Sequence, residues 1–240
     1  MACKRAGIMI RLAVFDLDGT LAELGKAVKG SDLAKLKEIE DRGVTIALCS
    51  GKPAYYLCGF LRQTGLKEPA IVGENGSVIQ KGIELPPEKF IVQSYSKEAE
   101  RTIEFLRYKL KEMLPDMWYQ PNLVGLTPFP KNEEQFEMIR KMLEENKDQI
   151  IDIDIYRHVD SYDFVPRGMS KYSGMKILGE MLEIPAEETV CVGDGVNDYP
   201  MFEYAGTSLG VSLQYPEKAD YNFPCIGDAL DHILREIKNQ

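Results

Sequence analysis

The stretch LAVFDLDGT, residues 12–20, decides the fold of this 240-residue chain. Its first four residues are apolar and form a short strand, which stops at two carboxylates and a glycine. Two more apolar runs, 44–49 and 189–192, stop in the same way at loops that contain Ser-Gly and Gly-Asp. Short, near-continuous apolar strands are typical of a parallel sheet that is covered on both faces.

Helical patterns alternate with these strands. Apolar residues three or four positions apart predict helices after Ser31, over 55–62, after Ser170 and over 230–237. The same alternation of strands and helices is found near both ends of the chain. We therefore expect an α/β fold whose core is a Rossmann-like parallel sheet.

A stretch of different character, residues 82–158, interrupts this alternation. It holds several of the 13 prolines of the chain, and Ser96 precedes an amphipathic helix. Asn132 and Gln135 are spaced as a capping box for a second helix, and the isoleucines of 151–155 alternate with polar residues as in a half-exposed antiparallel strand. We expect a core made of residues 1–81 and 159–240, with an inserted, smaller α+β domain over 82–158.

The composition is that of an ordinary globular protein, with 44% hydrophobic and 28% charged residues. Its 29 basic and 38 acidic residues give a formal net charge of −9, which argues against general binding to nucleic acid or to anionic membranes. No apolar run approaches the roughly 18 residues of a membrane span. An anionic substrate must therefore be attracted by local positive charge and not by the net field.

The N-terminal residues and the cysteines bear on the cellular compartment of the protein. The first residues, MACKRAGIMI, lack the apolar segment and cleavage site of a signal peptide, and Met9 is an alternative start. The five cysteines are scattered and form no C-x-x-C pair, which argues against a disulfide scaffold or a zinc knuckle. We expect a cytoplasmic protein.

Polar clusters follow the predicted core strands, where open α/β sheets bind ligands. The first holds Asp16 and Asp18, and two carboxylates this close need a cation or each raises the pKa of the other. One of them can attack an electrophile while the second transfers a proton. An Asx-turn at a strand end is the alternative explanation. Thr20 either braces this loop through its hydroxyl or caps the following turn, and the sequence favours neither.

Three further clusters have both a functional and an ordinary explanation. CSGK, residues 49–52, offers a hydroxyl, a bare backbone and an ammonium to phosphate oxygens, although Ser-Gly is also a common loop. Lys171 begins a helix, where the helix dipole disfavours a cation, so it either serves a site or is a solvated surface residue. GDGVND, residues 193–198, offers Asp194 and Asp198 to a hard cation such as Mg²⁺, or is a polar turn.

In this order, DLDGT, CSGK, Lys171 and GDGVND resemble the four motifs of the haloacid dehalogenase superfamily of phosphotransferases. GENG, residues 73–76, resembles the subgroup in which a cap domain (type IIB) is inserted between the second and third motifs. The resemblance covers the core on both sides of the insertion. One departure is that many relatives carry arginine where this chain has Lys52. The lysine ammonium is a compact charge and lacks the paired N–H donors with which a guanidinium binds two oxygens at once.

The resemblance implies the chemistry. Asp16 is then the nucleophile that forms an aspartyl-phosphate, and Asp18 protonates the leaving oxygen and later activates water. The family binds Mg²⁺ through Asp16, the backbone carbonyl of Asp18 and Asp194, with Asp198 binding it directly or through another ligand. Phosphoryl transfer asks the protein mainly for positioning and charge neutralisation, which these groups supply.

The resemblance also implies which residues meet the substrate. Ser50, Gly51 and Lys171 would hold the phosphoryl oxygens. The inserted domain would act as a cap that excludes water and selects the leaving group. Residues expected near the substrate are Asn75, Asn197, Lys52 and Arg157. Within the cap, the candidate contacts are Trp118, Tyr119, Asn122, Arg157 and His158, although Trp118 also suits the core of the cap and His158 an ordinary polar position.

The expected function is that of a Mg²⁺-dependent phosphomonoester hydrolase. Its partner would be a small phosphate ester, such as a sugar phosphate or phosphoglycolate, because a cap of this size encloses a limited volume. Two alternatives are a phosphomannomutase-like phosphotransferase, which uses the same chemistry, and a non-catalytic metabolite-binding module. Four acidic residues in the motifs argue against the binding module, since like charges are costly to keep together.

Overall fold

The computed structural model describes residues 9–238, and these residues form two compact units. The first unit takes the residues up to Ile91 and those from Ser170 onwards, and the second is Val92–Met169. The N-terminal residues on which the signal-peptide argument depends, together with Cys3, lie outside the described range. Met9 is its first residue.

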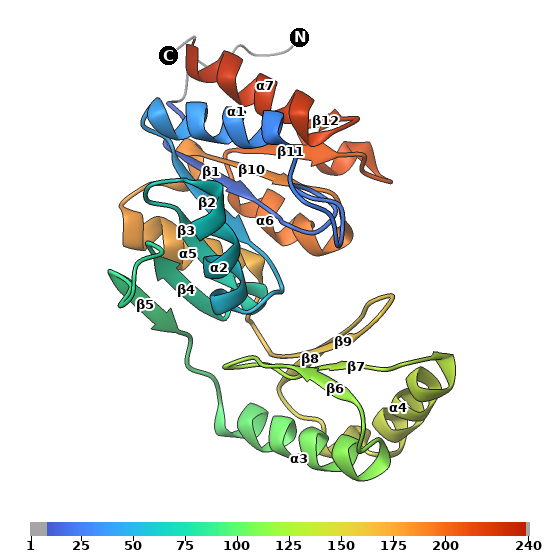
Figure 1. Ribbon diagram of the computed structural model, residues 1–240. Helices are drawn as coiled ribbons and strands as arrows, with labels where there is room; N and C mark the ends of the chain where they lie inside the picture. Colours follow the sequence, from blue (N-terminus) through green and yellow to red (C-terminus); the bar gives the residue numbers. More distant parts are fainter. Residues whose placement is uncertain (1–8, 239–240) are drawn as a thin grey trace. The chain divides into compact units, whose positions relative to one another are not determined.

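The first unit is built on an eight-stranded sheet with the order β12-β11-β10-β1-β2-β3-β4-β5 (Figure 1). Its strands are β1 Leu12–Phe15, β2 Thr45–Cys49, β3 Ala70–Gly73, β4 Val78–Lys81, β5 Lys89–Val92, β10 Thr189–Gly193, β11 Thr207–Val211 and β12 Tyr221–Phe223. Every pairing from β12 to β3 is parallel, and β3 pairs with β4 in antiparallel fashion. The predicted α/β fold is confirmed, with an antiparallel edge added to the parallel sheet.

Helices cover both faces of this sheet (Figure 1). They are α1 Gly30–Asp41, α2 Ala54–Thr64, α5 Lys171–Leu182, α6 Tyr199–Tyr204 and α7 Ile226–Lys238, with short 3₁₀ turns at η1 Glu74–Gly76, η3 Ala186–Glu188, η4 Val196–Asp198 and η5 Pro216–Lys218. Helices α1 and α7 pack against each other, and so do α5 and α6. One core cluster joins Leu12 and Val14 of β1 to Met175 and Leu178 of α5, so alternate residues of β1 serve the two faces.

The register of the central strands brings their C-terminal ends together. Phe15, the last residue of β1, lies opposite Leu48 of β2 and Val192 of β10. The Asp16 N–H still donates to the Val192 carbonyl at 2.9 Å, so the strand ladder runs up to the first carboxylate. The loops that follow β1, β2 and β10 therefore leave the sheet at one edge, as ligand-binding loops of open α/β sheets do.

The second unit packs two helices against short antiparallel strands. Its elements are α3 Lys97–Met113, β6 Trp118–Gln120, β7 Thr127–Phe129, α4 Glu133–Glu145, η2 Lys147–Gln149, β8 Ile153–Arg157 and β9 Tyr162–Pro166. Strands β6 and β7 form one pair and β8 and β9 another, and a bridge between Leu126 and Phe164 connects the two pairs. Apolar residues of both helices and of β9 share one core.

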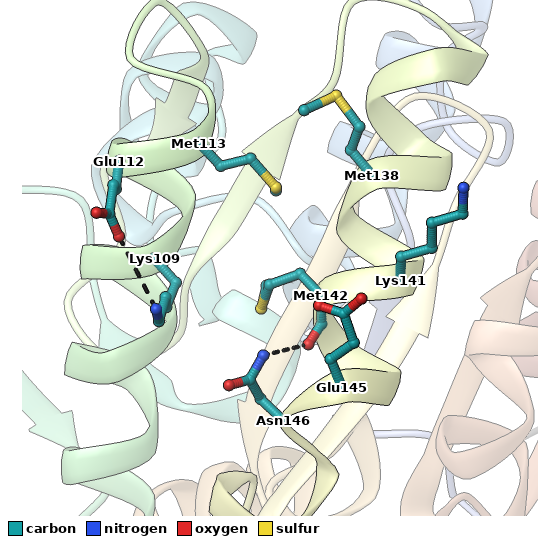
Figure 2. Close-up of a pocket in the computed structure, with 8 residues that line it drawn as sticks. All are labelled: Lys109, Glu112, Met113, Met138, Lys141, Met142, Glu145 and Asn146. Carbon is teal, nitrogen blue, oxygen red and sulfur yellow. Dashed lines mark hydrogen bonds and ion pairs between the residues drawn. The ribbon is translucent and has the colours of Figure 1, made fainter.

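A groove runs between α3 and α4 (Figure 2). It has a volume of about 380 Å³, and three methionine side chains, Met113, Met138 and Met142, line it between charged residues. The flexible thioether side chains of methionine fill irregular space, and here they leave part of the interhelical seam open. At its end, Asn146 donates from its side-chain amide to the Met142 carbonyl at 2.7 Å.

The second unit is displaced along the chain from the predicted insertion. It spans 92–169 where the sequence suggested 82–158. At its start the difference arises because β5 continues the large sheet beside β4, although all four of its residues are exposed. At its end, β9 pairs with β8 and closes the small unit before Ser170. The sequence shows neither β5 nor β9 clearly, since neither has a distinct polar-apolar alternation.

Two local predictions need adjustment. The Asn132 side chain caps α4 by accepting from the Gln135 N–H at 3.0 Å, but Gln135 returns its side chain to the Lys131 N–H and not to Asn132. The isoleucine strand begins at Ile153, because Asp152 has a φ of 61° and interrupts the extended backbone after Ile151.

The structure describes the state of four cysteines and the character of the helices. The four cysteines within residues 9–238 are free thiols, and burial raises the pKa of Cys49 to about 12. Among the helices of that range, none has both the length and the apolar character that a membrane crossing requires.

The Tyr119 hydroxyl is a buried polar group that has no hydrogen-bond partner within the described residues. Burial raises the pKa of this hydroxyl, so it stays protonated and needs an acceptor that it does not find. We predict that Tyr119→Phe raises the free energy of unfolding by about 1 kcal/mol, because the variant removes an unsatisfied buried group. Urea denaturation measures this value. Tyr108→Phe on exposed α3 is the control, and a loss of stability in Tyr119→Phe would contradict the prediction.

Candidate active site

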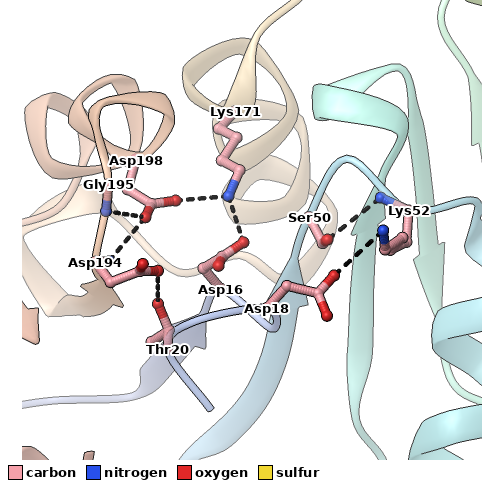
Figure 3. A network of polar contacts seen from close by, with 9 residues as sticks. All are labelled: Asp16, Asp18, Thr20, Ser50, Lys52, Lys171, Asp194, Gly195 and Asp198. Carbon is pink, nitrogen blue, oxygen red and sulfur yellow. Dashed lines mark hydrogen bonds and ion pairs between the residues drawn. The ribbon is translucent and has the colours of Figure 1, made fainter. Parts of the chain in front are cut away.

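Asp16 is the first polar residue after β1 and is only 4% exposed. All four residues of the strand before it are buried, so the Asp16 carboxylate lies where little water can solvate it. Such a group requires compensation by a cation or by hydrogen bonds. The compensation comes from Lys171, whose Nζ lies 2.6 Å from Asp16 Oδ1 (Figure 3).

Lys171 is the first residue of α5 and is 2% exposed. Ser170 caps this helix through a reciprocal pair of hydrogen bonds with Ser173, which fixes where Lys171 begins. The Lys171 ammonium bridges Asp16 and Asp198, with Nζ 2.6 Å from one carboxylate oxygen of each. The unfavourable position of a cation at a helix start is thus offset by two carboxylates, and Lys171 is no solvated surface residue.

Asp198 organises the loop after β10. It is fully buried, and its Oδ2 accepts the backbone N–H groups of Asp194 and Gly195 at 2.9 and 3.0 Å. Its Oδ1 accepts from Lys171. Both oxygens of Asp198 therefore already accept hydrogen bonds from protein groups, whereas Asp194 begins the loop directly after β10 and is partly exposed.

Thr20 and Gly19 fit closely around Asp194. The Thr20 hydroxyl donates to Asp194 Oδ1 at 2.6 Å, so of the two roles left open for this residue the structure shows the bracing one. Gly19 has a φ of 92°, and a Cβ built on it would lie 2.4 Å from Asp194 Oδ2. A larger residue at position 19 would push this carboxylate away, which explains the glycine.

Ser50 and Lys52 follow β2 (Figure 3). The buried Ser50 Oγ accepts the backbone N–H of Lys52 at 3.2 Å, so its own O–H proton remains available for an acceptor. Lys52 Nζ lies 3.4 Å from Asp18 Oδ2. Asn75 has a φ of 54°, and its side-chain oxygen would lie 3.2 Å from a Cβ built on Gly51. The turn at 74–76 thereby packs against the loop of the second motif.

Burial controls the charges of this cluster. It raises the pKa of Asp16 to about 7; Lys171 opposes this rise, while Asp198 and Asp194 add to it. Burial also raises the pKa of Asp194, which the hydrogen bond from Thr20 opposes. Burial alone would lower the pKa of Lys171, but Asp16 and Asp198 outweigh it and keep the ammonium charged. One ammonium thus faces three carboxylates, and the cluster can accept further positive charge.

Asp16, Asp194 and Asp198 can hold a metal ion. One carboxylate oxygen from each lies within 4.8 Å of the others. An all-oxygen set of carboxylates suits a hard divalent cation. The surplus of negative charge, the raised pKa of Asp16 and the close fit of Gly19 around Asp194 all agree with an ion at this place.

Asn197 and Arg157 are the other two predicted substrate residues. Asn197 is exposed within η4, next to the buried Asp198. Arg157 belongs to the second unit, where its guanidinium pairs with Glu133 at 3.0 Å and lies 4.8 Å from the centre of the Phe136 ring. These contacts hold the Arg157 side chain against α4, and its contact with substrate stays a prediction.

Three of the other candidate contacts of the cap, Trp118, Asn122 and His158, also have partners within that unit, whereas the Tyr119 hydroxyl has none among the described residues. Trp118 packs edge-on against Phe129, with 4.9 Å between ring centres, yet is 58% exposed. The Asn122 amide donates to Thr127 at 2.9 Å, and His158 lies 3.1 Å from Asp163. Sequence reasoning missed the Thr127 and Asp163 pair, which is joined by a buried 2.7 Å hydrogen bond, because neither residue stands in a recognisable motif.

Comparison with known proteins fits this arrangement. A family model described as haloacid dehalogenase-like hydrolase matches residues 13–124 and 95–214. A phosphoglycolate phosphatase of Thermoplasma acidophilum is 28% identical over 225 residues, which cover 92% of this chain and 91% of that protein. An HMP-PP phosphatase of Yersinia enterocolitica is 23% identical, with 87% and 86% covered. A solved HAD subclass IIB sugar phosphatase shares the fold with a TM-score of 0.67 at 21% identity, over 92% of this chain and 98% of that one.

The raised pKa of Asp16 predicts how stability depends on pH without a metal. The pKa of about 7 in the folded protein lies above the ordinary value of 3.8. The contribution of Asp16 to the free energy of unfolding is therefore fully present below pH 3.8 and is lost as the pH rises through 7. Asp16→Asn keeps the shape and removes the charge. In chelator, we predict that this variant unfolds at higher urea concentration than the wild type at pH 8, and that the difference shrinks toward pH 4.

Saturating divalent metal is the control for this prediction. The ion should stabilise the wild type at pH 8 more than Asp16→Asn, because it neutralises the ionised carboxylate. A difference between the two proteins that stays constant from pH 4 to pH 8 in chelator would show that Asp16 titrates normally.

Proposed function

This chain belongs to the haloacid dehalogenase-like hydrolase family, and we propose that it is a Mg²⁺-dependent phosphatase that works through an aspartyl-phosphate on Asp16. Its curated relatives are phosphatases, and they support a hydrolase that acts on small phosphorylated metabolites. The proposal adds Mg²⁺ as the metal, Asp16 as the nucleophile and a phosphomonoester as the substrate.

The observation that carries the proposal is the position of Asp16. Its carboxylate is buried at the end of the central strand, beside one ammonium and two further carboxylates. A structural ion pair needs one carboxylate for one ammonium, whereas this cluster gathers three carboxylates and one buried ammonium, which contacts two of them. The excess is useful where a divalent cation and a phosphoryl group, of opposite charge, bind together.

The residues of this chain can be given roles in two steps. In the first, an Asp16 oxygen attacks phosphorus, the bond from phosphorus to the leaving oxygen breaks, and Asp18 gives that oxygen a proton. In the second, Asp18 takes a proton from water, which attacks phosphorus and releases phosphate from Asp16. Lys171 offsets the charge of the phosphoryl oxygens, and the Ser50 hydroxyl donates a hydrogen bond to one of them.

Asp16 and Asp194 would hold the Mg²⁺ ion, and Asp198 would keep the loop and Lys171 in place. When bound, Mg²⁺ offsets the repulsion between a carboxylate nucleophile and a phosphate dianion. The pattern of hydrogen bonds supports this division, because both oxygens of Asp198 already accept from the protein.

We propose a small phosphomonoester as the substrate. Phosphoglycolate and HMP-PP in the names of two relatives, and a sugar phosphate in that of a solved structure, are all small phosphorylated metabolites. The negative net charge of this chain disfavours large polyanions. A small phosphorylated acid or sugar therefore fits better than a nucleic acid.

We predict that the purified protein releases phosphate from p-nitrophenyl phosphate and from members of a panel of phospho-acids and sugar phosphates, and that chelator abolishes the release. Asp16→Asn should lower turnover at least about 10⁴-fold, because it removes the nucleophile. Asp41→Asn, on the exposed surface beside Lys67, is the matched control and should retain full activity.

Three results would contradict parts of this proposal. Robust turnover by Asp16→Asn would exclude the covalent step. Phosphate exchange between positions of a sugar, with little release of inorganic phosphate, would favour a mutase. Binding of the panel with no turnover at any metal concentration would favour the non-catalytic alternative.

A further inference from the structure

Lys52 stands where many relatives carry arginine, and in this structure its side chain pairs with Asp18. Its Nζ lies 3.4 Å from Asp18 Oδ2. Figure 3 shows the Lys52 ammonium directed at the Asp18 carboxylate, while Lys171 lies at Asp16 and Asp198. The two lysines of the site thus contact different carboxylates.

The backbone of Lys52 is fixed from both sides. Its N–H donates to the buried Ser50 Oγ at 3.2 Å, and its carbonyl accepts the Glu74 N–H at 3.0 Å. Pro53 follows with a φ of −61° and precedes α2. The base of the Lys52 side chain is therefore held, although the side chain itself is 27% exposed.

Asp18 lies on a loop whose backbone is also held. Gly19 N donates to the Ala22 carbonyl at 2.8 Å, and Ala22 N donates to Leu17 at 2.9 Å. The Asp18 side chain is 28% exposed, so burial does not fix its rotamer as it fixes that of Asp16. An anchored lysine can supply that constraint in both protonation states, through the ion pair when Asp18 is ionised and through an ammonium hydrogen bond to the carboxyl oxygen when Asp18 carries its proton. Such a constraint matters because reactions lose rate steeply when a proton donor is misplaced.

We propose that Lys52 is a positioning residue that holds Asp18 in place for proton transfer, and that it is not a phosphate ligand. The inference rests on the proposed function, because it gives Lys52 a part in the two steps above. Asp18 loses its proton to the leaving oxygen when the first bond to phosphorus breaks, and regains one from water in the second step. Lys52 exchanges no proton and touches no reacting atom.

The leaving group separates this role from phosphate binding. An alkyl alcohol leaves only with a proton, whereas p-nitrophenolate leaves without one. Single-turnover release of the alcohol isolates the first step. We expect Lys52→Met to slow the best alkyl ester of the panel by about 30-fold, which is less than the roughly 10²–10⁴-fold that general acid catalysis contributes because Asp18 itself remains, and p-nitrophenyl phosphate by less than about 3-fold. Lys52→Arg should restore most of the alkyl rate.

A double-mutant cycle with Asp18→Asn tests whether Lys52 acts through Asp18. In that background, Lys52→Met should cause no further loss, because the group that it positions is gone. Lys67→Met, which removes the exposed ion pair with Asp41, is the matched control and should leave both esters unchanged.

Each other outcome has a definite meaning. Equal losses on both esters with a raised KM would make Lys52 a phosphate ligand and overturn the inference, as would losses that add fully to those of Asp18→Asn. An active wild type whose rates Lys52→Met leaves unchanged overturns the inference alone. A wild type inert on every ester overturns the proposed function and the inference together.

Discussion

The Lys171 ammonium, buried between Asp16 and Asp198, is the interaction on which the rest of this site depends. Without the Lys171 ammonium two buried carboxylates would lack a cation, and an uncompensated buried charge of this kind costs about 3–5 kcal/mol. Lys171 therefore fixes two carboxylates that come from distant parts of the chain. The N-terminal capping box of Ser170 and Ser173 fixes the start of α5, and with it the position of Lys171.

The parallel sheet is what allows this arrangement. Strands β1 and β10 are neighbours in register, so the loops that follow them begin side by side even though Thr20 and Asp194 are 174 positions apart in the sequence. The buried hydrogen bonds of Asp198 then shape the second loop, and Gly19 lets Asp194 come close to the first. The chemistry thus depends on backbone geometry at both loops as much as on the acidic side chains.

Much of this could be predicted from the sequence, because apolar strands that end in Gly, Ser or Asp carry a strong local signal. The strands before Asp16, Ser50 and Asp194 are of this kind, and they place their loops at one edge of the sheet. Lys171 is different, since nothing local to it reveals that two carboxylates lie nearby. Its only signal is a cation at a helix start, which by itself is weak.

The second unit was harder to predict. Strands β5 and β9 lack a clear alternation, so the boundaries of the unit fell about ten residues early. The pair of Lys52 with Asp18 was also beyond the sequence, because it joins the side chains of two motifs whose roles the family resemblance treats separately. Tertiary contacts, and not local propensity, decide such features.

The most direct test of the central claim is to find where the phosphoryl group goes. The wild type is mixed with a ³²P-labelled phosphate ester in a single turnover, quenched in acid within milliseconds and digested, and the labelled peptide is sequenced by mass spectrometry. The account predicts transient label on Asp16. Turnover with no trapped label, or label on another residue, would contradict it.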